Sequence, residues 1–179
     1  MSKLTITEAL AEIKTIEKRV RKKRDFVLSY LYRQEALKDP LIKEGGSSQA
    51  ISSVLQAISD LEERKVAIRC AIAKINAKTT VTVQSITKSM ADWLVWRREV
   101  APEASKFLAQ LRGQINSIRS EAQKKGYVTV AAGAEARPGD VIVNLDEMKL
   151  SQDIENLEVV LGTLDGALSL KNATTFVEL

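Results

Sequence analysis

Seven basic side chains stand close together near the N-terminus, and such a cluster could bind phosphate groups or an acidic protein. Residues 14–24 read K-T-I-E-K-R-V-R-K-K-R, with seven basic residues, one acidic residue and a local net charge of +6. Because the whole chain carries +4, the remaining residues sum to −2. A cationic patch on a helix can neutralise several phosphates, and such binding weakens steeply with salt. The candidate contact residues of this run are Lys18, Arg19, Arg21, Lys22, Lys23 and Arg24.

Three interpretations of this basic run remain open. It is a solvated helix face or the salt-bridge partner of an acidic segment such as residues 60–63, or it contacts an acidic protein, or it binds nucleic acid. Nucleic acid is the least favoured partner, because no aromatic residue is interleaved for base stacking and no nucleic-acid-binding motif surrounds the run. The favoured interpretation is the solvated or ion-paired face.

A second group of candidate contact residues combines tryptophan with arginine. Trp93 and Trp96 are the two tryptophans of the chain, and Arg97 and Arg98 follow them directly. Tryptophan and arginine are enriched at the energetic centres of protein interfaces. The same residues also suit a helix that packs on the base of a hairpin, since few other aromatic side chains are present to fill wide gaps. Core packing is the favoured interpretation, and partner contact is the alternative.

No set of residues indicates catalysis. Histidine is absent and Cys70 is the single cysteine, which excludes imidazole-based triads, histidine metal sites, internal disulfides and cysteine-rich zinc sites. The lone Cys70 is expected to be a small structural residue. Carboxylate pairs such as Asp60 with Glu63 have the spacing of ordinary helix-surface charges, and nothing places them in a pocket that would separate their pKa values. We therefore expect no enzymatic activity, no metal site and no cofactor.

The composition indicates a helical protein with an aliphatic core. The chain has 179 residues, of which 45% are apolar and only 4% aromatic, and this length is that of one ordinary domain, alone or with an extended arm. No stretch approaches the roughly 18 consecutive apolar residues of a membrane span. Lys3 and Glu8 interrupt any apolar core of a signal sequence. We expect an intracellular protein with no membrane partner.

The first predicted element is a long helix over residues 6–37. Thr5 and Glu8 have the spacing of a capping box, in which each residue bonds the backbone amide of the other. Apolar residues recur at seven-residue intervals from Ile6 to Val27 and form one stripe. The Asp39-Pro40 step is expected to end the helix, because proline disfavours helical backbone in the residue before it.

A second helix is predicted over residues 49–77, with Ser47 or Ser48 as its N-cap. Its apolar residues alternate at spacings of three and four over nearly four heptads, as in a coiled-coil seam. Lys65 is the one polar break, and it either sets the register or extends its ammonium group to water. Two long helices joined by a short Gly-Ser turn favour an antiparallel hairpin.

Short strands and helices are predicted to alternate in the second part of the chain. A β-branched run predicts a strand over residues 79–86, and a helix opens near Thr87 and is kinked or interrupted at Pro102. An apolar stripe over residues 104–122 predicts the next helix, which ends at Lys124-Lys125-Gly126. Strands follow at 127–131 and 141–145, then a helix capped by Asp146 over 147–164, and further strand composition within 168–177.

The predicted fold class is mainly α, with a long antiparallel coiled-coil-like hairpin and further helices. The short strands near residues 79–86, 127–131, 141–145 and 168–177 are expected to form one small β-sheet. Residues 1–78 form the helical hairpin, and residues 79–179 are expected to pack with the hairpin base as one domain.

Four segments of the chain carry a family resemblance. They are I-T-E-A-L-A-E-I-K-T-I-E-K-R-V at the start, A-I-A-K-I-N-A-K-T-T-V-T-V, M-A-D-W-L-V-W-R-R-E-V-A-P, and the ending L-S-L-K-N-A-T-T-F-V-E-L. These segments resemble uncharacterised helical proteins encoded beside structural genes in tailed bacteriophages and prophages. The T-E-A-L start and the I-N-x-x-T step are also similar, more distantly, to the septicolysin-like family of bacterial helical proteins, whose toxin name transfers no residue to this chain.

The phage resemblance implies a virion component, such as a capsid accessory (cement) protein or a protein of the head–tail region. We therefore expect a non-enzymatic structural protein that binds copies of itself, the major capsid protein or other virion proteins. Its expected location is the phage particle, and the bacterial host cytoplasm before assembly. The alternatives are a small nucleic-acid-binding protein that uses the basic helix 14–24, and a coiled-coil adaptor for a host protein.

Overall fold

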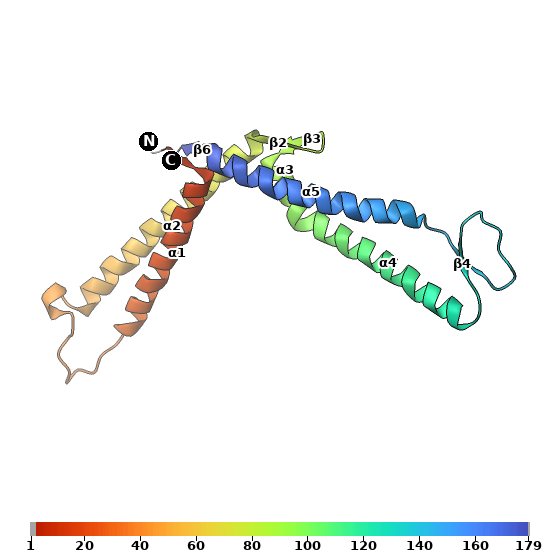
Figure 1. Cartoon of the computed structure of the whole chain (residues 1–179). Coiled ribbons are helices and arrows are strands. Elements are labelled where there is room, and N and C mark those ends of the chain that lie inside the picture. The colour runs from red at the N-terminus through yellow and green to blue at the C-terminus, as the bar shows by residue number, and fades with distance from the viewer. Residues whose placement is uncertain (1–2, 179) are drawn as a thin grey trace. The chain divides into compact units, whose positions relative to one another are not determined.

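The computed structural model describes residues 3–178, and within that range four long helices dominate the fold (Figure 1). Helical residues make up 69% of the chain, which confirms the mainly α prediction. The elements in order are β1 (Lys3–Thr5), α1 (Ile6–Ser29), η1 (Ile42–Glu44), α2 (Ser47–Lys78), β2 (Thr80–Val83), β3 (Ile86–Ser89), α3 (Met90–Val95), η2 (Trp96–Val100), α4 (Ala101–Lys124), β4 (Thr129–Ala131), β5 (Val141–Val143), α5 (Glu147–Thr174) and β6 (Phe176–Glu178).

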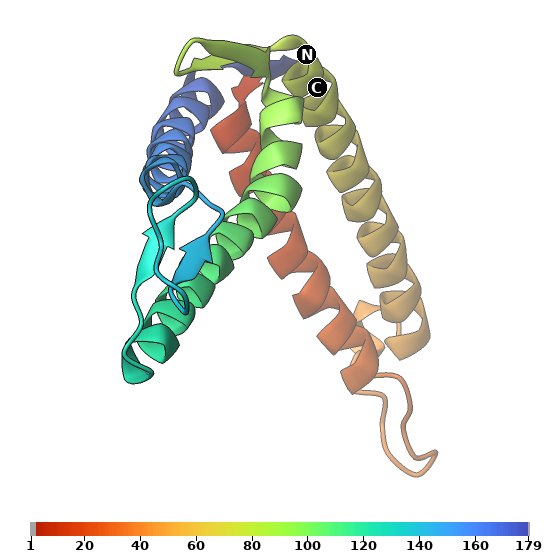
Figure 2. The ribbon, with the colours of Figure 1, turned by 90° about the vertical axis from the view of Figure 1, so that its right-hand side faces the viewer.

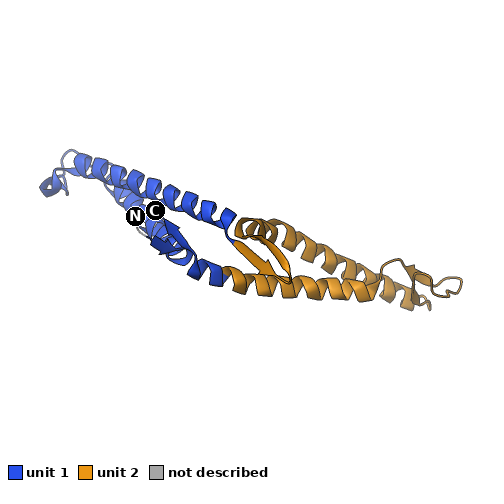
Figure 3. Cartoon of the chain, turned by 90° about the horizontal axis from the view of Figure 1, so that it is seen from above, with its two compact units in different colours: residues 1–79, 169–179 blue, residues 80–168 orange. Residues whose placement is uncertain are grey.

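The chain divides into two compact units, which Figure 3 shows in different colours. Unit 1 comprises residues 1–79 and 169–179, and unit 2 comprises residues 80–168. Unit 1 contains α1 and α2, and unit 2 contains α4 and most of α5, whose last residues belong to unit 1.

Unit 1 is a hairpin of α1 and α2, whose open end is closed by the strand pair β1–β6. The capping box is confirmed: the Thr5 Oγ1 accepts the Glu8 N–H at 3.2 Å, and the Glu8 carboxylate accepts the Thr5 N–H at 2.8 Å. One seam of apolar side chains joins the helices. Its buried members are Ile6, Ala9, Ile13, Ile16 and Val20 on α1, and Ile58, Ile68 and Ile72 on α2. The predicted antiparallel hairpin is therefore present.

Helix α1 ends at Ser29, eight residues before the predicted end. The seven-residue repeat that runs from Ile6 through Val27 would next require an apolar residue at position 34, which is Gln34. Helices in proteins are stabilised mainly by the burial of one apolar face. The repeat therefore has no member beyond Val27, and after Ser29 the chain continues as an irregular connection to α2.

Helix α2 begins at Ser47, close to the predicted start, but its cap is different. The predicted N-caps, Ser47 and Ser48, both lie inside the helix, and the N-cap residue is Gly46. The free amide of Ser47 instead donates to the carboxylate of Asp39, a residue eight positions earlier. The Asp39 carboxylate, which lies in the connection between α1 and α2, thus takes the place of an N-cap side chain.

Unit 2 begins with a two-stranded hairpin that the sequence prediction places only in part. Strand β2 lies within the predicted segment 79–86, but residues 86–89 form β3 rather than the start of a helix. Gln84 and Ser85 form the turn with φ values of 45° and 69°. Such turns favour Asn-Gly sequences, so the Gln-Ser sequence does not predict a hairpin here. Helix α3 then begins at Met90, with Ser89 as its N-cap.

The helical run that starts at Met90 continues past Pro102 to Lys124. Residues 96–100 form one π-helical segment, η2, and Pro102 lies in the first turn of α4 that follows it. Proline in a helix interior removes one backbone hydrogen bond and crowds the preceding turn, and π-helical turns are typical sites of helix bends. The chain is therefore not divided into two separate helices at Pro102, but the α-helical pattern is interrupted directly before it.

The second helix pair, α4 and α5, is linked by the short parallel strands β4 and β5. The predicted α4 stripe is confirmed by the burial of Ile115 and Ala122, and its end by Gly126 with φ +79°. Asp146 caps α5 as predicted, since its Oδ1 accepts the N–H groups of Met148 and Lys149 at 2.9 and 3.1 Å. A core cluster of Ile115, Val143 and Leu150 fixes the strands to both helices.

Helix α5 continues to Thr174, ten residues beyond the predicted end at 164. The strand composition at 168–170 is therefore helical, and only Phe176–Glu178 forms a strand. Leu164 and Leu168 are both buried, and their spacing of four belongs to one helix face. Their burial offsets the low helix propensity of Gly162 and Gly166, which had indicated a helix end.

The strands form three separate pairs rather than the single small sheet that the sequence predicted. The pairs are β1–β6 and β2–β3, both antiparallel, and β4–β5, which is parallel. Strand β1 is the partner of β6, and no strand was expected at Lys3–Thr5. Each pair closes the end of a helical element instead of contributing to a common sheet.

Candidate functional site

The basic run of α1 forms a collar around the helix. We call Lys18, Arg19, Arg21, Lys22, Lys23 and Arg24 the basic collar; all six are exposed except Lys23, which is half-buried. At about 100° per residue, these side chains cover the helix circumference except for one sector of about 100°. That sector holds the seam residues Ile16 and Val20. Positive charge therefore surrounds α1 on every side that does not face α2.

Few carboxylates neutralise the collar. Arg24 pairs with Glu62 of α2 at 2.7 Å, so one part of the predicted pairing with segment 60–63 is present. Within residues 3–178, no carboxylate lies within 4.0 Å of the charged nitrogens of the other five collar residues. Most of the local positive charge is therefore available to a partner.

Two further ion pairs join α1 to α2 on the side of the hairpin nearer the chain termini. Arg64 reaches Glu12 at 3.0 Å, and Lys65 reaches Glu17 at 2.8 Å. The hydrogen bond from Lys65, together with its charge, lowers the pKa of Glu17. Lys65 thus directs its ammonium group out of the seam, as the second interpretation predicts, but the group reaches the exposed Glu17 carboxylate instead of water alone.

The end of the hairpin away from β1 and β6 is the connection between α1 and α2 (Figures 1 and 2). It carries a concentration of exposed apolar side chains. We call residues 28–46 the hairpin tip. Its exposed large hydrophobic residues, with their relative exposures, are Leu28 (66%), Leu31 (62%), Tyr32 (85%), Leu37 (59%) and Ile42 (69%), and Leu55 (51%) of α2 is exposed as well. Sequence reasoning missed this surface because the predicted helix over 6–37 placed Leu31 and Leu37 on a continuing helix.

Asp39 holds the tip in one conformation. Its carboxylate accepts hydrogen bonds from the Leu41 N–H at 2.9 Å, the Ser47 N–H at 2.8 Å and the Ser47 Oγ at 2.6 Å. Arg33 lies 4.0 Å from the same carboxylate. The Ser47 hydroxyl and the backbone N–H groups, with a smaller effect of Arg33, lower the pKa of Asp39 to about 2. Asp39 is thus ionised at neutral pH and fixes the connection against the start of α2.

The tryptophan–arginine group occupies unit 2 and serves mainly as internal structure. Trp93 is buried, and its Nε1 donates to the Val81 carbonyl oxygen at 2.9 Å. The Trp96 ring is half-buried and meets the Trp93 ring edge-to-face, with centroids 5.5 Å apart. Arg97 pairs with Asp165 at 3.0 Å and Arg98 with Glu99 at 2.6 Å. This placement favours the core-packing interpretation for Trp93 and leaves Trp96, Arg97 and Arg98 partly accessible.

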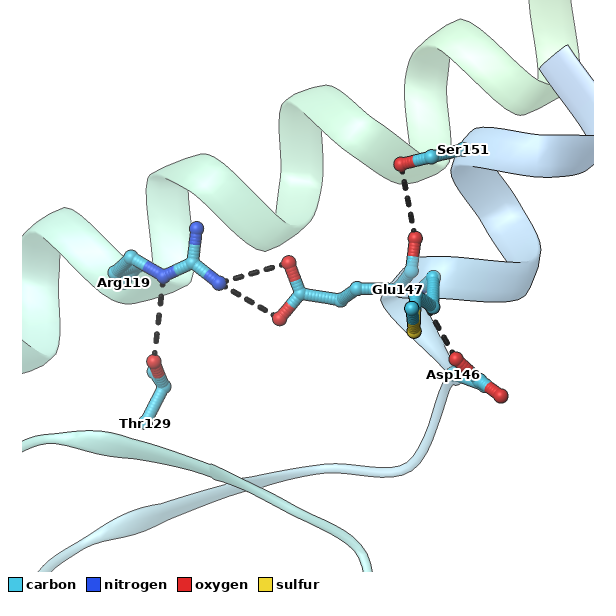
Figure 4. A network of polar contacts seen from close by, with 6 residues as sticks. Arg119, Thr129, Asp146, Glu147 and Ser151 are labelled. Carbon is cyan, nitrogen blue, oxygen red and sulfur yellow. Dashed lines mark hydrogen bonds and ion pairs between the residues drawn. The ribbon is translucent and has the colours of Figure 1, made fainter. Parts of the chain in front are cut away.

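A polar network that the sequence did not indicate lies at the far end of the α4–α5 pair (Figure 4). Arg119 donates to both carboxylate oxygens of Glu147 at 2.6 and 2.8 Å, and its Nε donates to Thr129 Oγ1 at 3.4 Å. These contacts join α4, β4 and the start of α5. Since both charged side chains are nearly half exposed, the network positions elements and offers no enclosed reaction site.

The chemistry that the described residues offer is that of binding surfaces. Within residues 3–178, no group of three or more cysteine and carboxylate residues is placed to hold a metal ion, and the side chains that are fully buried are all apolar. Cys70 is exposed and lines an open groove with Lys74 and Phe176. None of the helices in the described range is long and apolar enough to cross a membrane.

Comparison with known proteins yields one structural relative. No family model and no curated protein matches the chain. A crystal structure described as a functionally unknown conserved protein from Corynebacterium diphtheriae is similar over 99% of this chain and 100% of its own, with a TM-score of 0.60 and 15% sequence identity. At that identity the similarity shows a shared fold.

Proposed function

We propose that this protein is a non-enzymatic structural protein that works by assembling with other protein subunits. The observation that carries the proposal is the surface area. The chain exposes 12836 Å², whereas two separate compact proteins, each of half this mass, would together expose about 10,400 Å². The chain thus exposes more surface than two separate compact proteins of the same total mass. Because the comparison is with separate proteins, this excess area does not depend on how the two units are placed. It arises because each unit is thin and has a single apolar seam.

The outer faces of both helix pairs support the same proposal. Large apolar side chains stand exposed outside the seams, among them Val66 (61%) in unit 1 and Phe107 (60%) and Met148 (76%) in unit 2. Scattered apolar residues are normal on a monomer, but open faces on thin units become buried when subunits pack side by side. The outer edges of the strand pair β1–β6 could also accept a strand from a neighbour.

Within this class we assign the protein to the virion of a tailed bacteriophage, as a capsid accessory (cement) or head-associated protein. The sequence resemblance to proteins encoded beside phage structural genes supports this assignment. The expected partners are copies of the chain and the major capsid protein. The alternative of a nucleic-acid-binding protein would use the basic collar but leaves the exposed apolar faces without a role.

Quantitative mass spectrometry of purified phage particles tests the virion assignment. The chain is expected in the particles at a copy number comparable to that of a capsid or neck component. Its presence in the lysate of infected cells together with its absence from gradient-purified particles would exclude the assignment. A cytoplasmic phage enzyme measured in the same samples serves as the control for contamination.

A further inference from the structure

We propose that the hairpin tip docks on an anionic lipid surface, with its apolar side chains inserted between the headgroups and the basic collar held at the membrane surface. This inference goes beyond the proposed assembly function and does not depend on it. It concerns a peripheral contact, which needs no membrane-spanning helix.

The first argument is the apolar character of the tip. Leu31 and Tyr32 follow the last residue of α1 and are 62% and 85% exposed, so they are presented at the end of the hairpin instead of along its side. Two open grooves that share Leu28, of about 750 and 230 Å³, lie at the same end. Their linings contain Arg24, Arg33 and Lys38 but no carboxylate. The tip as a whole is neutral, since Glu35, Asp39 and Glu44 balance its three basic residues. The tip therefore favours an apolar partner, and the basic collar next to it favours one that carries negative charge.

The second argument is the distribution of charge around α1. A protein partner that lies along the hairpin contacts one side of a helix, whereas the collar presents basic side chains on all sides except the seam. A plane that meets the hairpin end-on would be reached by side chains from every direction, since long lysine and arginine side chains extend toward the headgroups. Clusters of four to eight such residues next to a membrane-inserted segment are typical of binding to anionic lipids.

The third argument is depth. Six residues separate Lys23 from Ser29 at the end of α1, which corresponds to about 9 Å along the helix axis. The polar interface of one leaflet is about 5–8 Å thick, and peripheral segments bury their apolar groups about 5–10 Å deep. With the end of α1 at this depth, Lys23 and Arg24 lie at the level of the lipid phosphates, and Lys18, about 16 Å from Ser29 along the helix axis, faces the membrane surface from further out.

Nucleic acid and protein partners fit the same observations less well. Phosphates of a duplex would engage the collar but would leave Leu31, Tyr32 and Ile42 in water. A second copy of this chain would have to match apolar groups at the end of the hairpin and positive charge around its shaft. An anionic bilayer has an apolar interior behind a negatively charged surface. Its interior can receive the apolar tip while its surface contacts the basic collar.

The test is binding of the full chain to vesicles of phosphatidylcholine, with and without about one third phosphatidylglycerol. Two variant pairs probe the two parts of the surface: Leu31→Asp with Tyr32→Asp in the tip, and Arg19→Glu with Lys22→Glu in the collar. The matched control is Arg112→Glu with Lys124→Glu on exposed positions of α4. All six substituted positions are exposed, so each variant is expected to keep its helices. Circular dichroism verifies this.

A second readout reports insertion directly. In a Cys70→Ser background, an environment-sensitive fluorophore is attached to Leu31→Cys, and separately to Gln110→Cys on an exposed position of α4 as a control. The expected results are binding only to the anionic vesicles, at least about tenfold weaker binding for each tip or collar variant pair, an unchanged control pair, and a rise in fluorescence at position 31 alone.

Several results would overturn the proposal. One is no binding to anionic vesicles, and another is binding that the tip variants leave unchanged. If the tip variants convert an oligomer to a monomer in sedimentation experiments and vesicles are not bound, a second copy occupies the tip. If the chain binds duplex DNA through the collar but does not bind vesicles, nucleic acid is the partner.

Discussion

Asp39 and Ser47 are joined by two hydrogen bonds, because the Ser47 N–H and Oγ both donate to the Asp39 carboxylate, at 2.8 and 2.6 Å. This contact spans the connection between α1 and α2. It supplies the N-terminal cap that Gly46 cannot provide from a side chain. The conformation of the hairpin tip therefore depends on one ionised carboxylate.

Acidification should loosen the hairpin tip. The pKa of Asp39 in the folded protein is about 2, below its ordinary value of 3.8. A lowered pKa means that the ionised group contributes stability above pH 3.8, and that this contribution is lost as the pH falls toward 2. Asp39→Asn should lower the thermal midpoint at pH 7, and the difference from the wild-type protein should shrink at pH 2. Glu63→Gln, on the exposed face of α2, is the control; an equal difference at both pH values would contradict the role given to Asp39.

Replacing either of two glycines inside α5 by alanine should stabilise the protein. Gly162 and Gly166 are exposed, and a Cβ added to either would meet no atom within 4 Å. Glycine in a helix interior costs about 0.5–1 kcal/mol relative to alanine. Gly162→Ala and Gly166→Ala should each raise the free energy of unfolding in urea by about that amount. Gly139→Ala should lower it, since Gly139 has φ +104° and its Cβ would overlap the Tyr127 ring. A loss of stability at either α5 position would show that the helix is not continuous there.

Substitution of the buried Trp93 should destabilise the protein more than substitution of Trp96. Trp93→Phe removes volume from a site that is 2% exposed and leaves the Val81 carbonyl oxygen without its donor. We expect a cost of about 2–3 kcal/mol in the free energy of unfolding. Trp96→Phe, at a half-buried ring, should cost less than about 1.5 kcal/mol. Urea unfolding followed by circular dichroism distinguishes the two, and a larger effect at Trp96 would contradict the packing described for unit 2.

The Arg119–Glu147 ion pair should contribute little despite its geometry. The two side chains are 48% and 44% exposed, and exposed pairs measured by double-mutant cycles contribute about 0.2–1 kcal/mol. Arg119→Ala, Glu147→Ala and the double variant should give a coupling energy in this range, which decreases in high salt. A coupling above about 2 kcal/mol would show that the network is shielded from solvent by something that covers this end of the pair.

The sequence predicts the helices well because their apolar residues repeat at a helical period. The capping box at Thr5, the seam of α2 and the stripe of α4 are local patterns, and they are found as expected. The missed features depend on residues far apart or on unusual backbone: the turn at Gln84-Ser85 uses positive φ values without glycine, and β1 finds its partner β6 from the opposite end of the chain.

The same distinction explains the candidate site. The charge of the basic collar is visible in the sequence, and so is its helical arrangement. The apolar tip is not visible, because its exposure depends on where α1 ends and on the contact of Asp39 with Ser47. Burial of Trp93 likewise depends on the β2–β3 hairpin, whose Val81 carbonyl receives the indole N–H.

Cross-linking in cells tests the central claim, assembly with other protein subunits, most directly. Cells that express the chain from its natural genome are treated with a lysine-reactive cross-linker, and a mixture of isotopically light and heavy chains distinguishes links between copies from links within one copy. We expect links from lysines on the outer helix faces, such as Lys74 and Lys106, to a second copy or to a particle protein. Links confined to single chains, at an expression level where the chain is abundant, would contradict the assembly function.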